Sequence, residues 1–195
     1  MREIAKIFLL IIGPSGSGKT AIADRLCEEH DMKQVWSYTN RPQRRENEPG
    51  HIFIKETDIT KIKKKYPNRV AETVFDNFYY FSDAAQVETS DIYVISPDAV
   101  PQFMENYKGK KKVKIIYVTV PEWVRRNRML RRGDSEANVE QRIIHDRSAF
   151  SAEGVKYDLE IRNFVLSDSV DRICEAVKEW EKEKRAKSEK SKSKG

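Results

Sequence analysis

Residues 7–20 read IFLLIIGPSGSGKT, an unbroken apolar run followed by a loop of small residues that ends in a lysine and a threonine. Six apolar residues in a row, Ile7 to Ile12, are typical of a strand buried on both faces, as the strands of a parallel sheet are. Residues 19–30 then have helical spacing, with Ile22 and Leu26 on one face. This stretch therefore predicts a strand, a tight loop and a helix in that order.

The loop matches the pattern G-x-x-x-x-G-K-[ST] at every fixed position, in the strand, loop and helix setting that the pattern requires. Backbone N–H groups of such a loop form a concave site for phosphate oxygens, and the positive end of the next helix points at the same anion. We expect Lys19 to contact the β- and γ-phosphates of ATP and the Thr20 hydroxyl to bind Mg²⁺, the expected cofactor with ATP. The predicted ATP-binding residues are Gly13, Pro14, Ser15, Gly16, Ser17, Gly18, Lys19 and Thr20.

Outside this loop, apolar runs alternate with amphipathic segments along most of the chain. Further strands are expected at residues 34–38, 91–95, 114–120 and 158–161. Helices are expected after Pro97, after Pro121, at residues 136–150 and at residues 169–184. Strands that alternate with helices in this way predict an α/β fold, a three-layer P-loop NTPase sandwich with a mainly parallel sheet.

Between residues 37 and 82 the pattern changes to short strand-like pieces around one basic helix, with a hairpin turn expected at Asp76-Asn77. We interpret this segment as a small β-rich insertion that binds the acceptor of a transferred group. The predicted organisation is a P-loop core at residues 1–36 and 83–180, a lid at about 129–142 within it, the acceptor-binding insertion at 37–82 and a charged flexible tail at 181–195.

Composition and charge limit the classes of partner. A hydrophobic content of 38% is enough for a packed core. The net charge is 37 − 31 = +6, but residues 181–195 hold seven basic and three acidic residues, so the body carries only +2 and no nucleic-acid partner is expected. The longest apolar run is too short to cross a bilayer, and two cysteines make no disulfide framework. We therefore expect a cytoplasmic protein with no membrane contact.

Two arginine clusters follow the P-loop in sequence. The first, Arg41 with Arg44 and Arg45, lies in an extended segment that contains a proline, and guanidinium groups there could hold the phosphate of an acceptor. The second surrounds Gly133, which can separate two helices of a lid that brings arginines over the transferred phosphoryl group. Either cluster alone is also typical of a solvated basic surface, and the P-loop before them favours the phosphate-binding interpretation.

Taken together, these motifs resemble the guanylate kinase family of P-loop nucleoside monophosphate kinases over about residues 6–180. The segments that carry the resemblance are the P-loop with its Pro14-Ser15 pair, Ser37-x-Thr39-x-Arg41-x-x-Arg44, Glu72 with Phe75 and Tyr79-Tyr80-Phe81-Ser82, Arg128-x-x-x-Arg132-Gly133 with Arg142, and Tyr157-Asp158-x-x-Ile161-x-Asn163.

The resemblance implies a role for each candidate site residue. It implies that Ser37, Glu72 and Ser82 read the guanine base of GMP or dGMP. It implies that Arg41, Arg44 and Tyr80 hold the acceptor phosphate. The catalytic residues that it implies are Lys19, Arg128, Arg132 and Arg142. The expected reaction is transfer of the ATP γ-phosphoryl group to GMP or dGMP, and the expected partners are ATP and a nucleoside monophosphate.

The chain also departs from the family pattern. Phe53 stands where the family has a phosphate-contacting tyrosine, and Phe81 stands where it has a glycine. The central strand of the family ends in an Asp-rich segment that helps to organise Mg²⁺, whereas this chain has Ser96-Pro97-Asp98. Asp98 is the candidate substitute for the metal-organising acid.

Two other functions stay open. The first is the same kinase chemistry on another phosphorylated acceptor, which is a different or modified nucleotide or a sugar such as ribose 1,5-bisphosphate. The segment from Arg41-Pro42 to Gly50-His51-Ile52 is similar to the kinases of that sugar. The second is a non-catalytic guanylate-kinase-like module that binds a protein partner in the acceptor cleft, although such modules commonly have degraded P-loops and this one is complete. The oligomeric state is left open.

Overall fold

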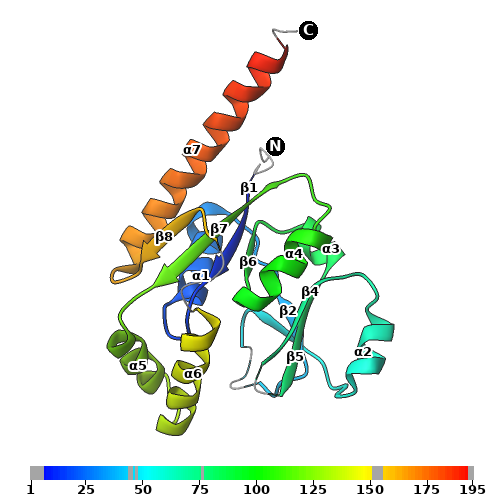
Figure 1. Ribbon diagram of the computed structural model, residues 1–195, viewed down its shortest axis with the longest axis vertical. Helices are drawn as coiled ribbons and strands as arrows, with labels where there is room; N and C mark the ends of the chain where they lie inside the picture. Colours follow the sequence, from blue (N-terminus) through cyan, green and yellow to red (C-terminus); the bar gives the residue numbers. More distant parts are fainter. Residues whose placement is uncertain (1–6, 44–45, 47, 76, 151–155, 193–195) are drawn as a thin grey trace.

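A computed structural model describes residues 7–43, 46, 48–75, 77–150 and 156–192 of the chain. Its core is a four-stranded sheet in the order β6-β1-β7-β8, and every neighbouring pair of strands is parallel (Figure 1). The strands of this sheet are β1 (Ile7–Ile12), β6 (Ile92–Val94), β7 (Lys112–Thr119) and β8 (Leu159–Arg162). The predicted parallel sheet is thereby confirmed.

Helices cover both faces of the core sheet, because β1 is apolar on both sides. Alternate residues of β1 enter two separate clusters, Leu9 in one and Leu10 in the other. The first cluster includes residues of α1 (Lys19–His30) and α7 (Leu166–Lys192). The second includes residues of α3 (Ala84–Glu88), η1 (Pro97–Ala99) and α4 (Val100–Asn106). Two helical layers around one sheet make the three-layer α/β sandwich that the sequence predicts.

A second sheet occupies the segment predicted as the insertion. Its order is β3-β2-β5-β4, with β2 parallel to β3 and the other pairs antiparallel. Its elements are β2 (Ser37–Thr39), β3 (His51–Phe53), α2 (Ile59–Lys65), β4 (Arg69–Phe75) and β5 (Phe78–Asp83). Asp58 caps α2, and the buried Ile62 packs that helix onto one face of the sheet with Tyr79 and Phe81.

The segment predicted as a lid, at about 129–142, falls on two helices, α5 (Glu122–Arg131) and α6 (Glu136–Ala149), which we call the lid helices. Gly133, in the left-handed region at φ 96°, makes the turn between them, and the Ser135 hydroxyl accepts a hydrogen bond from Asn138 N at the start of α6. Met129, Val139 and Ile143 form a small buried cluster of their own between the two helices. In Figure 1 the lid and the insertion lie on either side of the end of the core sheet at which α1 begins.

Two expectations differ from the structure. The strand expected at residues 34–38 is divided, because Gln34 makes only an isolated bridge to Ile92 of the core while Ser37 begins β2 of the second sheet. The segment predicted as a flexible tail is helical as far as Lys192, where α7 extends past the sheet (Figure 1). Its Lys, Glu and Ala residues are strong helix formers, and α7 is already anchored by Ile173 and Val177. Among the described residues, no helix is both long enough and apolar enough to cross a membrane.

Candidate active site

The P-loop connects β1 to α1 through backbone conformations that need glycine. Gly18 precedes α1 at φ 96°, and a Cβ there would lie 2.2 Å from the Asn163 side-chain nitrogen. Gly16 adopts φ 76°, and a Cβ there would lie 2.7 Å from the carbonyl oxygen of Arg125. Side chains at these two positions would push away both the lid and the end of β8. The close packing holds the loop in one shape around the start of α1.

The side chain of Lys19 folds back over the P-loop. Its Nζ donates hydrogen bonds to the carbonyl oxygens of Gly13 at 2.6 Å and Pro14 at 3.0 Å. The pKa of Lys19 is lowered to about 8, mainly because the side chain is buried. The carboxylate of Asp146 raises this pKa, and the nearby arginines Arg132, Arg125 and Arg142 lower it. The ammonium group is therefore a charge that a bound anion would stabilise.

Asp146 of α6 is a site residue that the sequence analysis missed. Its Oδ2 accepts hydrogen bonds from the Ser15 backbone N–H at 2.8 Å and from Arg125 Nη1 at 2.9 Å, and its side chain is only 7% exposed. The carboxylate thus joins both lid helices to the P-loop. A single aspartate in an amphipathic helix carries no motif, so no sequence signal could have identified it.

A first cavity of about 320 Å³ lies between the P-loop and the lid. Its lining residues are Ser15, Gly16, Gly18, Lys19, Thr20, Ala21, Arg128, Arg132 and Arg142. The structure therefore brings all three predicted lid arginines together with the predicted lysine. This arrangement of cations and loop N–H groups suits the phosphate chain of a nucleoside triphosphate.

The three lid arginines differ in how they are held. Arg128 donates to the carbonyl oxygens of Ser17 at 3.2 Å and Asn163 at 2.8 Å, so it is fixed against the P-loop. Arg132 is paired with Asp134 on the same turn. Arg142 lies with its guanidinium 5.3 Å from the ring centre of Phe75, at the end of β4, and therefore reaches across to the insertion.

Of the two candidate magnesium ligands, Thr20 lines the first cavity and Asp98 does not. A threonine hydroxyl is an oxygen ligand of the kind that Mg²⁺ takes. Asp98 is exposed and accepts a hydrogen bond from the Thr73 hydroxyl of β4. The structure therefore does not bring Asp98 together with Thr20. Within the described part of the chain, no three His, Cys, Asp or Glu side chains group as a metal site.

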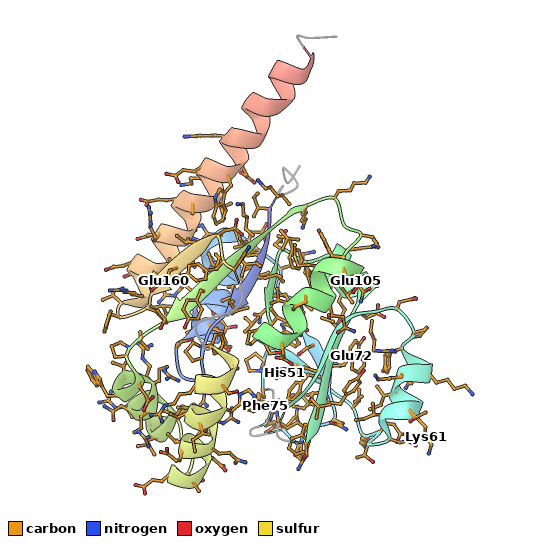
Figure 2. The ribbon with its side chains drawn as sticks, in the orientation of Figure 1. His51, Lys61, Glu72, Phe75, Glu105 and Glu160 are labelled. Carbon is orange, nitrogen blue, oxygen red and sulfur yellow. The ribbon has the colours of Figure 1, made fainter. Side chains whose placement is uncertain are left out.

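A second cavity, of about 240 Å³, runs from the P-loop to the insertion. The P-loop contributes Gly13, Ser15 and Lys19, and the lid contributes Arg142 and Asp146. From the insertion come Ser37, His51 and Tyr80, with Phe75 at the edge; His51 and Phe75 are labelled in Figure 2. One wall thus offers the loop, Lys19 and Arg142, and the facing wall offers mainly neutral polar and aromatic groups, with Glu72 at its border.

The predicted acceptor residues are only partly brought together. Ser37 and Tyr80 line the second cavity, whereas Arg41 and Ser82 do not. Arg41 is buried, and its guanidinium forms a two-point ion pair with Glu48, at 2.7 and 3.3 Å. Ser82 is fully buried inside the insertion. Arg44 lies outside the described residues.

Glu72 is the largest difference between the expected and the observed site. It borders the cavity, but its Oε1 is bonded to Lys63 Nζ at 2.6 Å and its Oε2 to Arg69 Nε at 2.7 Å and to the Tyr79 hydroxyl. Burial alone would raise the pKa of Glu72, but the hydrogen bonds from Lys63, Tyr79 and Arg69 lower it to about 2. The carboxylate is thus already satisfied by the protein.

A parallel sheet, a glycine-rich loop before a helix and an arginine-bearing lid define the P-loop kinase fold. A family model described as AAA domain matches residues 9–149, well over half of the chain. The chain therefore belongs to this AAA domain family.

Among the solved structures of other proteins that are similar to the chain are the following two. The crystal structure of guanylate kinase from Anaplasma phagocytophilum superposes with a TM-score of 0.62 at 18% sequence identity, covering 89% of this chain and 85% of that one. The crystal structure of an uncharacterized protein from Eubacterium ventriosum superposes with a TM-score of 0.47 at 15% identity, covering 88% of this chain and 98% of that one. No curated protein matches the chain by sequence. At these identities, the first superposition establishes the fold that the chain shares with guanylate kinase.

Proposed function

We propose that this protein is a kinase that transfers the γ-phosphoryl group of ATP to the phosphate of a nucleoside monophosphate. GMP or dGMP is the acceptor that the motif resemblance implies. The observation that carries the proposal is the pair of cavities that share Ser15, Lys19 and Arg142. A triphosphate in the first cavity and an acceptor in the second would place their phosphates next to each other at these shared residues.

Catalysis in such a site is mainly positioning and charge neutralisation. The loop N–H groups and Lys19 would hold the β- and γ-phosphates, while Arg132 and Arg142 would stabilise the negative charge that spreads over the transferred group. An acceptor phosphate oxygen is already ionised at neutral pH, so the reaction needs no general base. Arg128 has its bonds to Ser17 and Asn163, which suit it to fixing the lid at the loop.

Mg²⁺ bound with ATP would screen the phosphate charges, and Thr20 is the residue that would hold it. The Thr20 hydroxyl lies in the same cavity as Lys19, so the protein ligand and the lysine would act on one phosphate chain. We do not assign Asp98 to this role, because it does not line the cavity that Thr20 lines and its carboxylate accepts a hydrogen bond from Thr73.

A second acceptor class is favoured by one observation. Glu72, the residue expected to identify guanine, has both carboxylate oxygens bonded to neighbouring side chains. The same phosphoryl transfer to another phosphorylated acceptor, either another nucleotide or a sugar phosphate, therefore stands beside the GMP proposal.

The test is ADP formation from Mg-ATP with a panel of acceptors: GMP, dGMP, AMP, UMP, CMP and ribose 1,5-bisphosphate. The proposal predicts that at least one nucleoside monophosphate accelerates ADP formation by a factor of about 100 or more over ATP alone. Acceleration by the sugar phosphate alone would support the second acceptor class. ATP binding without acceleration by any acceptor would contradict the kinase proposal and support a non-catalytic binding module.

A further inference from the structure

The sheet register of the insertion divides its residues between two faces. Tyr80 pairs with Thr73 on one side and Thr39 on the other, while Phe81 pairs with Glu72 and Tyr38. Because successive side chains of a strand alternate between faces, these two sets lie on opposite faces of the sheet. Thr73 and Tyr80 line the acceptor cavity, whereas Phe81 and Tyr38 pack in the cluster beneath α2.

Glu72 belongs to the face that packs against α2. Its partner Lys63 is on α2, and its partner Tyr79 is in the buried cluster beneath that helix. To turn toward a base on the other face of the sheet, the Glu72 carboxylate would have to give up its bonds to Lys63, Arg69 and Tyr79. Such a loss is costly for partly buried charges.

The cavity face carries a different polar group in the corresponding region. Ser37 of β2 and His51 of β3 are direct neighbours in the parallel pair, and Ser37 Oγ lies 2.8 Å from His51 Nδ1. Both residues line the cavity, and the ring of Tyr80 lies 5.6 Å from the ring of His51.

The remaining walls near this pair are apolar or aromatic. Phe75, Tyr93 and Ile95 line the same cavity as the Ser37–His51 pair. Flat apolar walls with a few polar groups suit a planar heteroaromatic ring, which stacks on aromatic side chains, better than they suit a hydrated sugar. The cavity therefore favours an acceptor that carries a base.

We propose that the Ser37–His51 pair, and not Glu72, reads the base of the acceptor, so that the enzyme does not distinguish purine monophosphates by their 2-amino group. The proposal rests on the proposed kinase function. A neutral imidazole has one donor and one acceptor nitrogen. If Ser37 donates to Nδ1, then Nε2 carries the hydrogen; if Nδ1 donates to Ser37, then Nε2 accepts. The pair can adapt to a carbonyl oxygen or to a ring N–H, but it has no carboxylate to bind N1–H and the 2-amino group of guanine together.

GMP and IMP provide the direct test, because they differ only in the 2-amino group. We expect kcat/KM for the two to agree within a factor of about 5, whereas a site that pairs a carboxylate with the 2-amino group would separate them by about 10-fold or more. We expect His51→Ala to raise KM for both by about 10-fold or more and to leave KM for ATP unchanged, since His51 lines the second cavity and not the first. His51→Gln, which keeps a polar group near the Nε2 position, should restore part of the loss.

Glu72→Gln separates the two assignments, because the motif resemblance gives the base-reading role to Glu72, whose carboxylate is bonded to Lys63 on the α2 side of the sheet. It should leave the ratio of kcat/KM for GMP and IMP unchanged. A strong preference for GMP that Glu72→Gln abolishes would overturn the proposal, as would an unchanged acceptor KM in His51→Ala. Equilibrium binding of GMP and IMP to the unaltered protein distinguishes failure of the kinase proposal from failure of the base-recognition proposal. If both nucleotides bind but neither is phosphorylated, the kinase proposal fails. Base recognition is then tested by the binding constants of the His51 variants.

Discussion

The P-loop and the insertion form two sides of the second cavity, and they differ in how their charged side chains are bonded. The P-loop side comes from one short loop through Gly13, Ser15 and Lys19, and Lys19 donates hydrogen bonds to backbone oxygens of that same loop. In the insertion, two charged residues predicted to bind substrate are bonded to other charged side chains. Arg41, which does not line the cavity, is paired with Glu48, and Glu72, which borders it, is paired with Lys63 and Arg69. Lys19 is thus bonded to neutral backbone oxygens, whereas Arg41 and Glu72 of the insertion are each paired with an opposite charge.

This difference shows that charge in a segment does not by itself locate a binding surface. Arg41 and its partner Glu48 are only 7% and 11% exposed, and a ligand phosphate would have to compete with a buried carboxylate for the guanidinium. Lys19 would exchange two backbone hydrogen bonds for a phosphate, and a charge-assisted bond of that kind is the stronger one. We therefore expect substitutions in the P-loop wall and lid to act on catalysis, and those in the insertion's ion pairs to act on stability.

The largest effect is expected for Lys19→Ala. Loss of this cation from the phosphate cavity should reduce kcat by about 1000-fold or more, because the lysine stabilises charge on the transferred group. Turnover should be measured with the best acceptor of the panel at saturating ATP. The midpoint of thermal unfolding should stay within a few degrees of that of the unaltered protein. A variant that keeps more than a tenth of the activity would contradict the role of Lys19 in stabilising the transferred group.

Arg142→Ala should have the next largest effect. Arg142 lines both cavities, so its loss should reduce kcat by about 100-fold through lost stabilisation of the transferring group. The matched control is Arg126→Ala, since Arg126 lies on the lid surface in an exposed pair with Glu140. Equal losses of activity in the two variants would show that lid stability, and not the position of Arg142, sets the rate.

A smaller effect is expected from Asp146→Asn, and it concerns pH. The pKa of Lys19 is about 8, so its positive charge, and with it ATP affinity of the free enzyme, should fall as the pH rises through 8. Asp146 raises that pKa, so its neutralisation should move the midpoint to lower pH. Titration of ATP binding between pH 6 and 10 measures the shift. An unchanged midpoint would mean that Asp146 only holds the lid.

The smallest effect on activity, and a clear effect on stability, is expected from Glu72→Gln. The pKa of Glu72 is lowered to about 2, so its contribution to folding is complete above its ordinary range near 4.5 and is lost as the pH falls toward 2. At neutral pH, we expect the variant to lose about 1–2 kcal/mol of unfolding free energy because Lys63 and Arg69 lose a charged partner. Denaturant unfolding at pH 7 and pH 3 should show a larger difference at pH 7.

The parts of the molecule that follow from local pattern could be predicted from sequence. The strand, loop and helix around Lys19 need only neighbouring residues, and the antiparallel pairing of Phe75 with Phe78 joins residues three positions apart. Of the turn predicted at Asp76-Asn77, Asp76 lies outside the described residues. The lid arginines could be grouped because one glycine separates two helices. In each case the residues that determine the structure lie close together in the chain.

The remaining features depend on contacts between distant residues. The face that Glu72 occupies is fixed by strand pairing, and β4 has an irregular register between Arg69 and Ala71, so counting along the sequence could not assign it. The bond between Asp146 and Ser15 joins residues 131 positions apart. The hydrogen bond between Ser37 and His51 exists only because β2 and β3 are parallel neighbours.

The central claim is that two anionic substrates bind end to end between the P-loop and the insertion. The most direct test is the binding of a single molecule that joins adenosine and guanosine through five phosphates. The account predicts that this molecule binds at least about 100-fold more tightly than either ATP or GMP, because one association places both halves. An affinity no higher than that of ATP alone would contradict it.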